Sequence, residues 1–218
     1  VLPVPVMIAT HLRPYAPKGA AFRSTADAPC SSGWETLVGG PGDASFRPEL
    51  LISRGAASVS LCFQPPRSFC CSDVEIAQRG NAIHWRSGDV GAIFYHRPDV
   101  PDEAGGFEFE IKLDRYPGKA PLRFEIDRTG CSLHYQAPLT DADRANGFER
   151  REEVDGSYAV YTDDGQKIGH IYRPVAHDAN GVAAVCAFNP DADERGVLEV
   201  FIPDTVAREA AYPIVVDP

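Results

Sequence analysis

The sequence has no long apolar run, and this absence limits the classes to which the chain could belong. A helix that crosses a bilayer needs about 18–20 apolar residues, and no stretch of the 218 residues approaches that length. The apolar beginning VLPVPVMIATHL has no basic region before it, and Pro3 and Pro5 would break the helix of a signal peptide. We therefore expect no membrane partner and interpret these residues as an extended arm.

Helix-forming patterns are also scarce. The chain has one Met and few long amphipathic stretches, but it has 19 Gly and 19 Pro. Glycine and proline disfavour helix interiors and are common in the turns between short strands. This composition argues against a helical bundle and is typical of a protein built from short strands.

Basic residues are too few for a surface that binds nucleic acid. The net charge is −10, whereas phosphate binding needs a basic face. Residues 1–60 contain five basic and four acidic residues, so the remainder carries −11. A nearly neutral beginning joined to an acidic body fits either an arm that docks on a partner or a loop-rich start of a single domain.

Signatures of common active sites and metal sites are missing. The sequence has no GxSxG elbow, no P-loop, no GxGxxG, no HExxH and no CxxC. We therefore expect no enzymatic activity and no cofactor, and we assign no catalytic, cofactor-binding or metal-binding residue. A hydrolase whose site has no familiar motif remains an alternative.

The six cysteines do not have the regular spacing of a disulfide framework. They are Cys30, Cys62, Cys70, Cys71, Cys131 and Cys186. Cys62, Cys131 and Cys186 lie in strand-like runs, where a free thiol serves as a small apolar side chain. We expect mostly reduced cysteines and assembly in a reducing cytoplasm.

From about residue 50, strand-like runs recur about every 8–12 residues with turn residues between them. The clearest is 107–113, FEFEIKL, in which apolar and charged residues alternate. Asn180-Gly181 is a strong hairpin signal because both residues tolerate positive φ. The runs are 58–63, 82–87, 91–96, 107–113, 122–126, 131–136, 157–162, 167–174, 182–188, 197–203 and a final strand within 211–218.

This pattern predicts an all-β fold, an antiparallel β-sandwich or jelly-roll-like domain over residues 56–218. Frequent prolines predict that residues 1–55 form an extended N-terminal arm and loops. They are Pro3, Pro5, Pro14, Pro17, Pro29, Pro41 and Pro48. Residues 140–153 are the one candidate for a helix or long loop, and VAREAA at 206–211 is expected to form a helical turn before the last strand.

Several polar groups could form sites, and each also has an ordinary structural interpretation. The acidic turns 140–147, 162–165 and 191–196 could bind calcium, but Asp, Asn and Gly also dominate turns. Glu108 and Glu110 point to one sheet face, which is either solvated or, if it forms a cleft, suited to a glycosidase. The histidines could bind a metal only if they converged; they are His11, His84, His96, His134, His170 and His177.

Aromatic residues in the second half could form a glycan-binding platform, or they could be core and cross-strand pairs. They are Tyr135, Tyr158, Tyr161, Tyr172 and Phe188. The sequence alone leaves both interpretations open.

Four segments together resemble a β-rich module of uncharacterised tailed-phage virion proteins and of some large bacterial surface proteins. They are LHYQAPLT (133–140), GSYAVY (156–161), HIYRPVAHDANG (170–181) and LEVFIPDTVAREAAYPIVVDP (198–218). The resemblance covers roughly residues 80–218 and implies a structural module whose last strand closes the domain. It supplies no catalytic residues.

Strand pattern, charge distribution and resemblance together favour a non-enzymatic structural component of a phage-like virion, assembled in the host cytoplasm. The most specific form of this hypothesis is a capsid decoration or cement protein, with a tail-associated component as a close variant. Its expected partners are the major capsid or other virion proteins and further copies of itself. The alternative is a secreted or cell-surface adhesion module that binds glycan.

Overall fold

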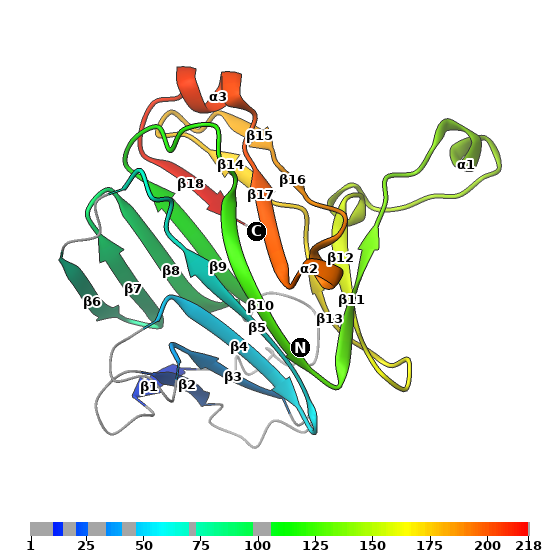
Figure 1. Ribbon diagram of the computed structural model, residues 1–218, viewed down its shortest axis with the longest axis horizontal. Coiled ribbons are helices and arrows are strands. Elements are labelled where there is room, and N and C mark those ends of the chain that lie inside the picture. Colours follow the sequence, from blue (N-terminus) through cyan, green and yellow to red (C-terminus); the bar gives the residue numbers. More distant parts are fainter. Residues whose placement is uncertain are drawn as a thin grey trace, which may run out of the picture.

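Two large antiparallel sheets pack face to face, and a smaller third sheet lies beside them in the computed structural model (Figure 1). The structure describes residues 11–14, 21–25, 34–40, 47–69, 73–97 and 106–217. Every strand pairing among these residues is antiparallel, which confirms the predicted all-β sandwich.

The first sheet has eight strands in the order β1-β2-β3-β4-β5-β10-β17-β16. Their bounds are β1 His11–Pro14, β2 Phe22–Thr25, β3 Trp34–Val38, β4 Glu49–Arg54, β5 Ala57–Gln64, β10 Leu122–Thr129, β16 Ala187–Phe188 and β17 Val197–Phe201. The second sheet has seven strands in the order β15-β14-β18-β9-β8-β7-β6. Their bounds are β6 Val74–Arg79, β7 Ala82–Ser87, β8 Val90–Arg97, β9 Gly106–Leu113, β14 Val175–His177, β15 Ala183–Val185 and β18 Ile214–Asp217.

The third sheet has three strands, and the helices are short. The strands are β11 Cys131–Gln136, β12 Ser157–Thr162 and β13 Lys167–Ile171. The helices are α1 Asp141–Ala145, the 3-10 helix η1 Glu152–Val154, α2 Ala192–Arg195 and α3 Asp204–Glu209. Within the described residues, none of the helices has the length and apolar content of a membrane-spanning segment.

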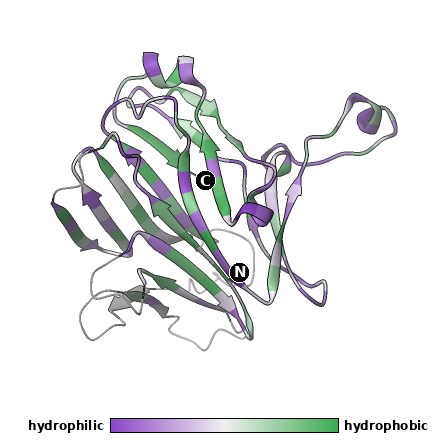
Figure 2. Ribbon diagram, in the orientation of Figure 1, coloured by the Kyte–Doolittle hydropathy of each residue, from purple (hydrophilic) through white to green (hydrophobic). Residues whose placement is uncertain are grey.

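Alternating side chains place a row of phenylalanines between the two large sheets. Phe124 of β10 has its ring centroid 5.4 Å from that of Phe109 of β9, at an interplanar angle of 88°. Phe63 of β5 lies 5.4 Å from Phe124, and Phe94 of β8 lies 4.3 Å from Phe109. Burying each such side chain contributes about 1.5–3 kcal/mol, so this row is a principal contact between the sheets. In Figure 2 the hydrophobic colour alternates with the hydrophilic colour along these strands.

The last described strand closes the second sheet, as the sequence predicts. β18 pairs with β9 on one side and with β14 on the other. Ile214 and Val216 are buried and Val215 is half-buried, in agreement with a period of two. The preceding helical turn is also confirmed, as α3.

The predicted boundary between an arm at 1–55 and a sandwich at 56–218 falls inside a hairpin. β4 pairs with β5 along its whole length, and β3 pairs with β4. The first sheet therefore begins before residue 56. The physical reason is that ELLISR at 49–54 follows Pro48 but contains no proline, so all its backbone N–H groups can enter the ladder. Most of the other residues of the predicted arm lie outside the described ranges.

Candidate interaction site on a projecting segment

Residues 137–156, here called the projecting segment, connect β11 to β12 and extend away from the sheets (Figure 1). They contain α1 and η1, and α1 buries none of its residues. Figure 2 shows α1 as mainly hydrophilic. Since the segment has no large apolar core of its own, its conformation must depend on local polar contacts.

A capping box fixes the start of α1. The backbone N–H of Asp143 donates to Thr140 Oγ1 at 3.1 Å, and the backbone N–H of Thr140 donates to Asp143 Oδ2 at 2.8 Å. This reciprocal arrangement satisfies two N–H groups that a helix beginning leaves unpaired. Hydrogen bonding to the side chain and backbone of Thr140 lowers the pKa of Asp143.

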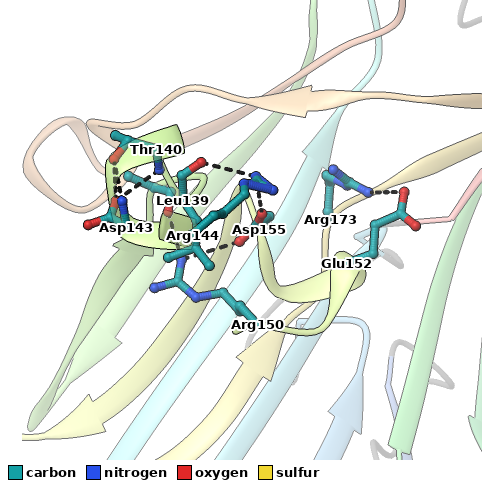
Figure 3. A network of polar contacts seen from close by, with 9 residues as sticks. Leu139, Thr140, Asp143, Arg144, Arg150, Glu152, Asp155 and Arg173 are labelled. Atoms are coloured by element: carbon teal, nitrogen blue, oxygen red, sulfur yellow. Dashed lines mark hydrogen bonds and ion pairs between the residues drawn. The ribbon is translucent and has the colours of Figure 1, made fainter. Parts of the chain in front are cut away.

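Two arginines connect the beginning and the end of the projecting segment through hydrogen bonds and ion pairs (Figure 3). Arg150 donates to the carbonyl of Ala137 at 2.6 Å and lies 3.4 Å from Asp155. Arg144 donates to the carbonyl of Leu139 at 3.0 Å and lies 3.7 Å from the same carboxylate. Because Asp155 lies near both guanidinium groups, it links the middle of the segment to its end.

Arg173, just after β13, holds the base of the segment. Its guanidinium lies 3.1 Å from the carboxylate of Glu152 (Figure 3), and its backbone N–H donates to the carbonyl of Glu153 at 3.2 Å. These two contacts attach the projecting segment to the chain that directly follows β13.

This preorganised segment exposes an aromatic side chain. Phe148 follows α1 and is 61% exposed. A large exposed aromatic side chain on a loop with a fixed conformation is a common anchor in protein–protein interfaces. The segment therefore has the properties of a binding element.

An apolar groove of about 440 Å³ lies at the base of the projecting segment. Its apolar lining includes Tyr135, Pro138, Val185, Phe188, Phe201 and Ile202, and its charged lining is Asp155 and Arg173. Val185 and Phe201 remain 47% and 42% exposed. A groove with few polar groups and exposed apolar walls suits binding of an apolar side chain.

The titratable groups in the lining of the groove include Cys186, Asp155 and Arg173. Burial raises the pKa of the Cys186 thiol to about 12, so this lining residue is protonated near neutral pH. Asp155 lies beside Arg144 and Arg150, and Arg173 beside Glu152. The groove lies next to the projecting segment, and Pro138, Asp155 and Gly156 belong to both.

The histidines predicted as possible ligands are distributed over several sheets. His134 and His170 lie on the third sheet, His84 on β7 and His177 on β14. His11 and His96 lie in β1 and β8, but their side chains are outside the described set. Among the described residues, no group of three or more His, Cys, Asp or Glu side chains could hold a metal ion.

One histidine lies next to a serine, but the geometry does not make that serine a nucleophile. Ser157 Oγ is 2.7 Å from His170 Nε2 and donates to the carbonyl of Val154 at 2.5 Å. Ser157 is fully buried, so no substrate reaches it. Burial, with the positive charge of Lys167, lowers the pKa of His170 to about 4.

The acidic turns have structural contacts within the chain. Asp143 belongs to the capping box, and Thr162 Oγ1 donates to Asp164. Asp191 accepts from Asn189 at 2.8 Å, and Asp193 lies 2.9 Å from Arg128 and accepts from the backbone N–H of Leu133. Four carboxylates of these turns therefore have partners within the chain.

Glu108 and Glu110 lie on β9 with their neighbours Phe109 and Ile111 buried on the other face. Glu110 accepts a hydrogen bond from Tyr95 at 2.5 Å. Burial, followed by this contact, raises the pKa of the Tyr95 hydroxyl. The glutamates thus lie on a partly solvated strand face.

Of the two interpretations of these aromatic residues, the structure supports core and cross-strand packing. Tyr158 and Phe188 are buried, with ring centroids 5.9 Å apart, and Tyr135 packs 5.2 Å from Tyr158. Tyr161 lies three residues after Tyr158 on the same strand, so it points to the opposite face and contacts His134. Tyr172 is exposed and packs on His170.

Three of the cysteines are free and buried, as expected for apolar fillers. They are Cys62, Cys131 and Cys186. Cys30, Cys70 and Cys71 lie outside the described residues. Burial raises the pKa of each of the three described thiols.

No family model, no curated protein sequence and no solved structure matches this chain. The resemblance to a virion or surface-protein module therefore remains a prediction. Sequence reasoning did not identify the groove, because its lining comes from segments that are far apart in the chain. The only sequence signal was the charged run at 140–153 between two strands.

Proposed function

We propose that this protein is a non-enzymatic assembly module that attaches to another protein through the projecting segment and the groove at its base. The observation that carries the proposal is an exposed Phe148 on a segment fixed by Arg144, Arg150 and Asp155. A binding element that is already ordered loses little conformational entropy when its partner docks. The proposed role of Phe148 and the projecting segment is to bind another protein, which involves no chemical reaction.

The specific form that we propose is a structural virion component, namely a decoration or cement protein on the capsid of a phage-like particle, or a tail-associated protein. The resemblance of residues 80–218 supports this form, as does the acidic composition. A net negative body remains soluble and can face outward while one element contacts the shell. Capsid proteins and further copies of this chain are the expected partners, with no direct contact to nucleic acid or membrane.

The test begins with mass spectrometry of particles purified from the source organism. The proposed virion role requires this chain among the particle proteins, and its absence from all such particles would remove that role. A photo-crosslinking amino acid at position 148 should then identify the protein that contacts the projecting segment.

A matched pair of variants tests the surface itself. Phe148→Asp should weaken binding to the particle by about thirtyfold, because a central aromatic anchor contributes about 2 kcal/mol or more. Val182→Asp is the control, since Val182 is an equally exposed apolar residue (59%) outside the segment and the groove lining. Equal effects of the two changes would contradict the proposed surface.

One observation favours the alternative of a glycan-binding module. A groove on the third sheet has Ser132, His134, Gln136 and Tyr161 among its lining residues. Hydrogen-bonding groups beside an aromatic ring suit a sugar. Binding on a glycan array that Tyr161→Ala abolishes would support this function in place of the first.

A further inference from the structure

Strand β6 forms one end of the second sheet and has β7 as its partner there (Figure 1). Five of its six residues are exposed and the sixth is half-buried. An exposed edge presents backbone N–H and C=O groups that can pair with another strand. β6 is therefore a candidate for pairing between chains.

The face of β6 that continues the core carries two exposed apolar side chains, Val74 and Ile76. Val74 lies opposite Ser87 and Ile76 opposite Trp85, so both point to the face on which Trp85 is buried. Yet Val74 is 54% exposed and Ile76 is 42% exposed. A partner strand beside β6 would extend the apolar face on which Trp85 is buried.

The other face of β6 carries complementary charges at a suitable spacing. Glu75 and Arg79 are four residues apart and lie on the same face. If two copies of β6 pair antiparallel about a twofold axis at Ala77, Glu75 of each copy lies opposite Arg79 of the other. Opposite charges at directly paired positions stabilise a sheet, and this register forms two such pairs.

The hydrogen-bond pattern permits this register. Arg79 pairs with Ala82 across a two-residue turn, and such a terminal pair exchanges its hydrogen bonds within the hairpin. Because the pattern alternates, Ile76 and Val74 direct their backbone groups away from β7. A twofold axis at Ala77 places Ile76 of each copy in a hydrogen-bonding pair with Gln78 of the other copy, whereas Val74 lies opposite Gly80, a turn residue with positive φ.

We propose that two copies of this chain associate through β6, which joins their seven-stranded sheets into one continuous sheet across a twofold axis at Ala77. The partner strand would cover Ile76 on one face and form the Glu75–Arg79 pairs on the other. This inference does not depend on the proposed function, because β6 is separate from the projecting segment and the groove.

Sedimentation velocity over a wide range of protein concentration tests the proposal. The unmodified chain should form a dimer, and Glu75→Arg or Arg79→Glu should raise its dissociation constant about tenfold, because each creates two like-charge pairs. The double variant Glu75→Arg with Arg79→Glu should restore dimerisation, since it exchanges the charges. Glu209→Arg makes the same charge change on exposed α3 and should have no effect.

A covalent readout tests the position of the axis. In the proposed register the two Ala77 residues form a non-hydrogen-bonded pair with Cα atoms about 4.5 Å apart, within the range that a disulfide spans. Ala77→Cys should therefore give a dimer under mild oxidation in which mass spectrometry finds the 77–77 link. A chain that stays monomeric, a dimer unaffected by the charge variants, or failure of the double variant to restore it would each overturn the proposal.

Discussion

The hydroxyl of Tyr158 joins the third sheet to the first. It accepts a hydrogen bond from the backbone N–H of Ala192 at 3.1 Å and donates one to the carbonyl of Asn189. Tyr158 is fully buried, so water does not replace either contact. Tyr158→Phe removes one oxygen atom and leaves two buried backbone groups without their partner.

We expect this variant to lose about 2 kcal/mol of unfolding free energy, because a buried group without a hydrogen bond costs about 1–3 kcal/mol and the backbone relaxes partly. For a chain of this length, that loss lowers Tm by about 4–8 °C. Urea unfolding followed by circular dichroism gives the free energy, and a thermal scan gives Tm. The m-value should stay constant, which shows that the folded state keeps its compactness.

Tyr161→Phe is the matched control. It removes the same atom from the same strand, but Tyr161 points to the opposite, half-buried face. Its expected effect is within about 0.5 kcal/mol of zero. If Tyr158→Phe destabilised the protein no more than Tyr161→Phe does, the hydroxyl would not link the two sheets.

Three other outcomes are expected. Arg150→Ala should speed proteolysis within residues 137–156 several-fold without changing Tm, whereas Arg151→Ala, which removes a highly exposed guanidinium, should change neither. Because the pKa of His170 falls from 6.5 to about 4 on folding, unfolded chains bind more protons below about pH 6.5. The contribution of His170 to the free energy of unfolding should therefore decrease from about pH 6.5 to about pH 4 and stay constant below that. Urea midpoints measured across this range should decrease less for His170→Gln than for the unmodified chain. An equal decrease in both proteins would contradict the lowered pKa of His170. Cys186, whose pKa is raised to about 12, should resist thiol reagents at neutral pH until the protein is unfolded, as peptide mapping can show.

Local patterns were sufficient to predict most strands. The alternation at 107–113 corresponds to β9, and the turn at Asn180-Gly181 connects β14 to β15. These predictions succeeded because a strand with one buried face needs a period of two, and a tight turn needs residues that tolerate its backbone angles. The predicted run at 167–174 ends early at Ile171 because Pro174 interrupts it, and the following strand joins another sheet.

Other features depend on contacts between distant residues and left little trace in the sequence. VEIAQR at β6 lacks a strong apolar alternation, and five of its six residues are exposed. The carbonyl that Arg150 contacts belongs to a residue 13 positions away, and a backbone acceptor has no sequence signature. Spacing alone predicts that Tyr158 and Tyr161 do not share a platform. Their positions in the strand differ by three, an odd number, so their side chains point to opposite faces of the sheet.

The central place of β18 has a consequence for synthesis. The ribosome makes β9 about a hundred residues before β18, and β14 also precedes it, yet the two earlier strands meet only through β18. While the chain is being made, the second sheet must therefore remain as two separate groups of strands with exposed edges. The two groups can join only after residues 214–217 have been made, because β18 pairs with both β9 and β14.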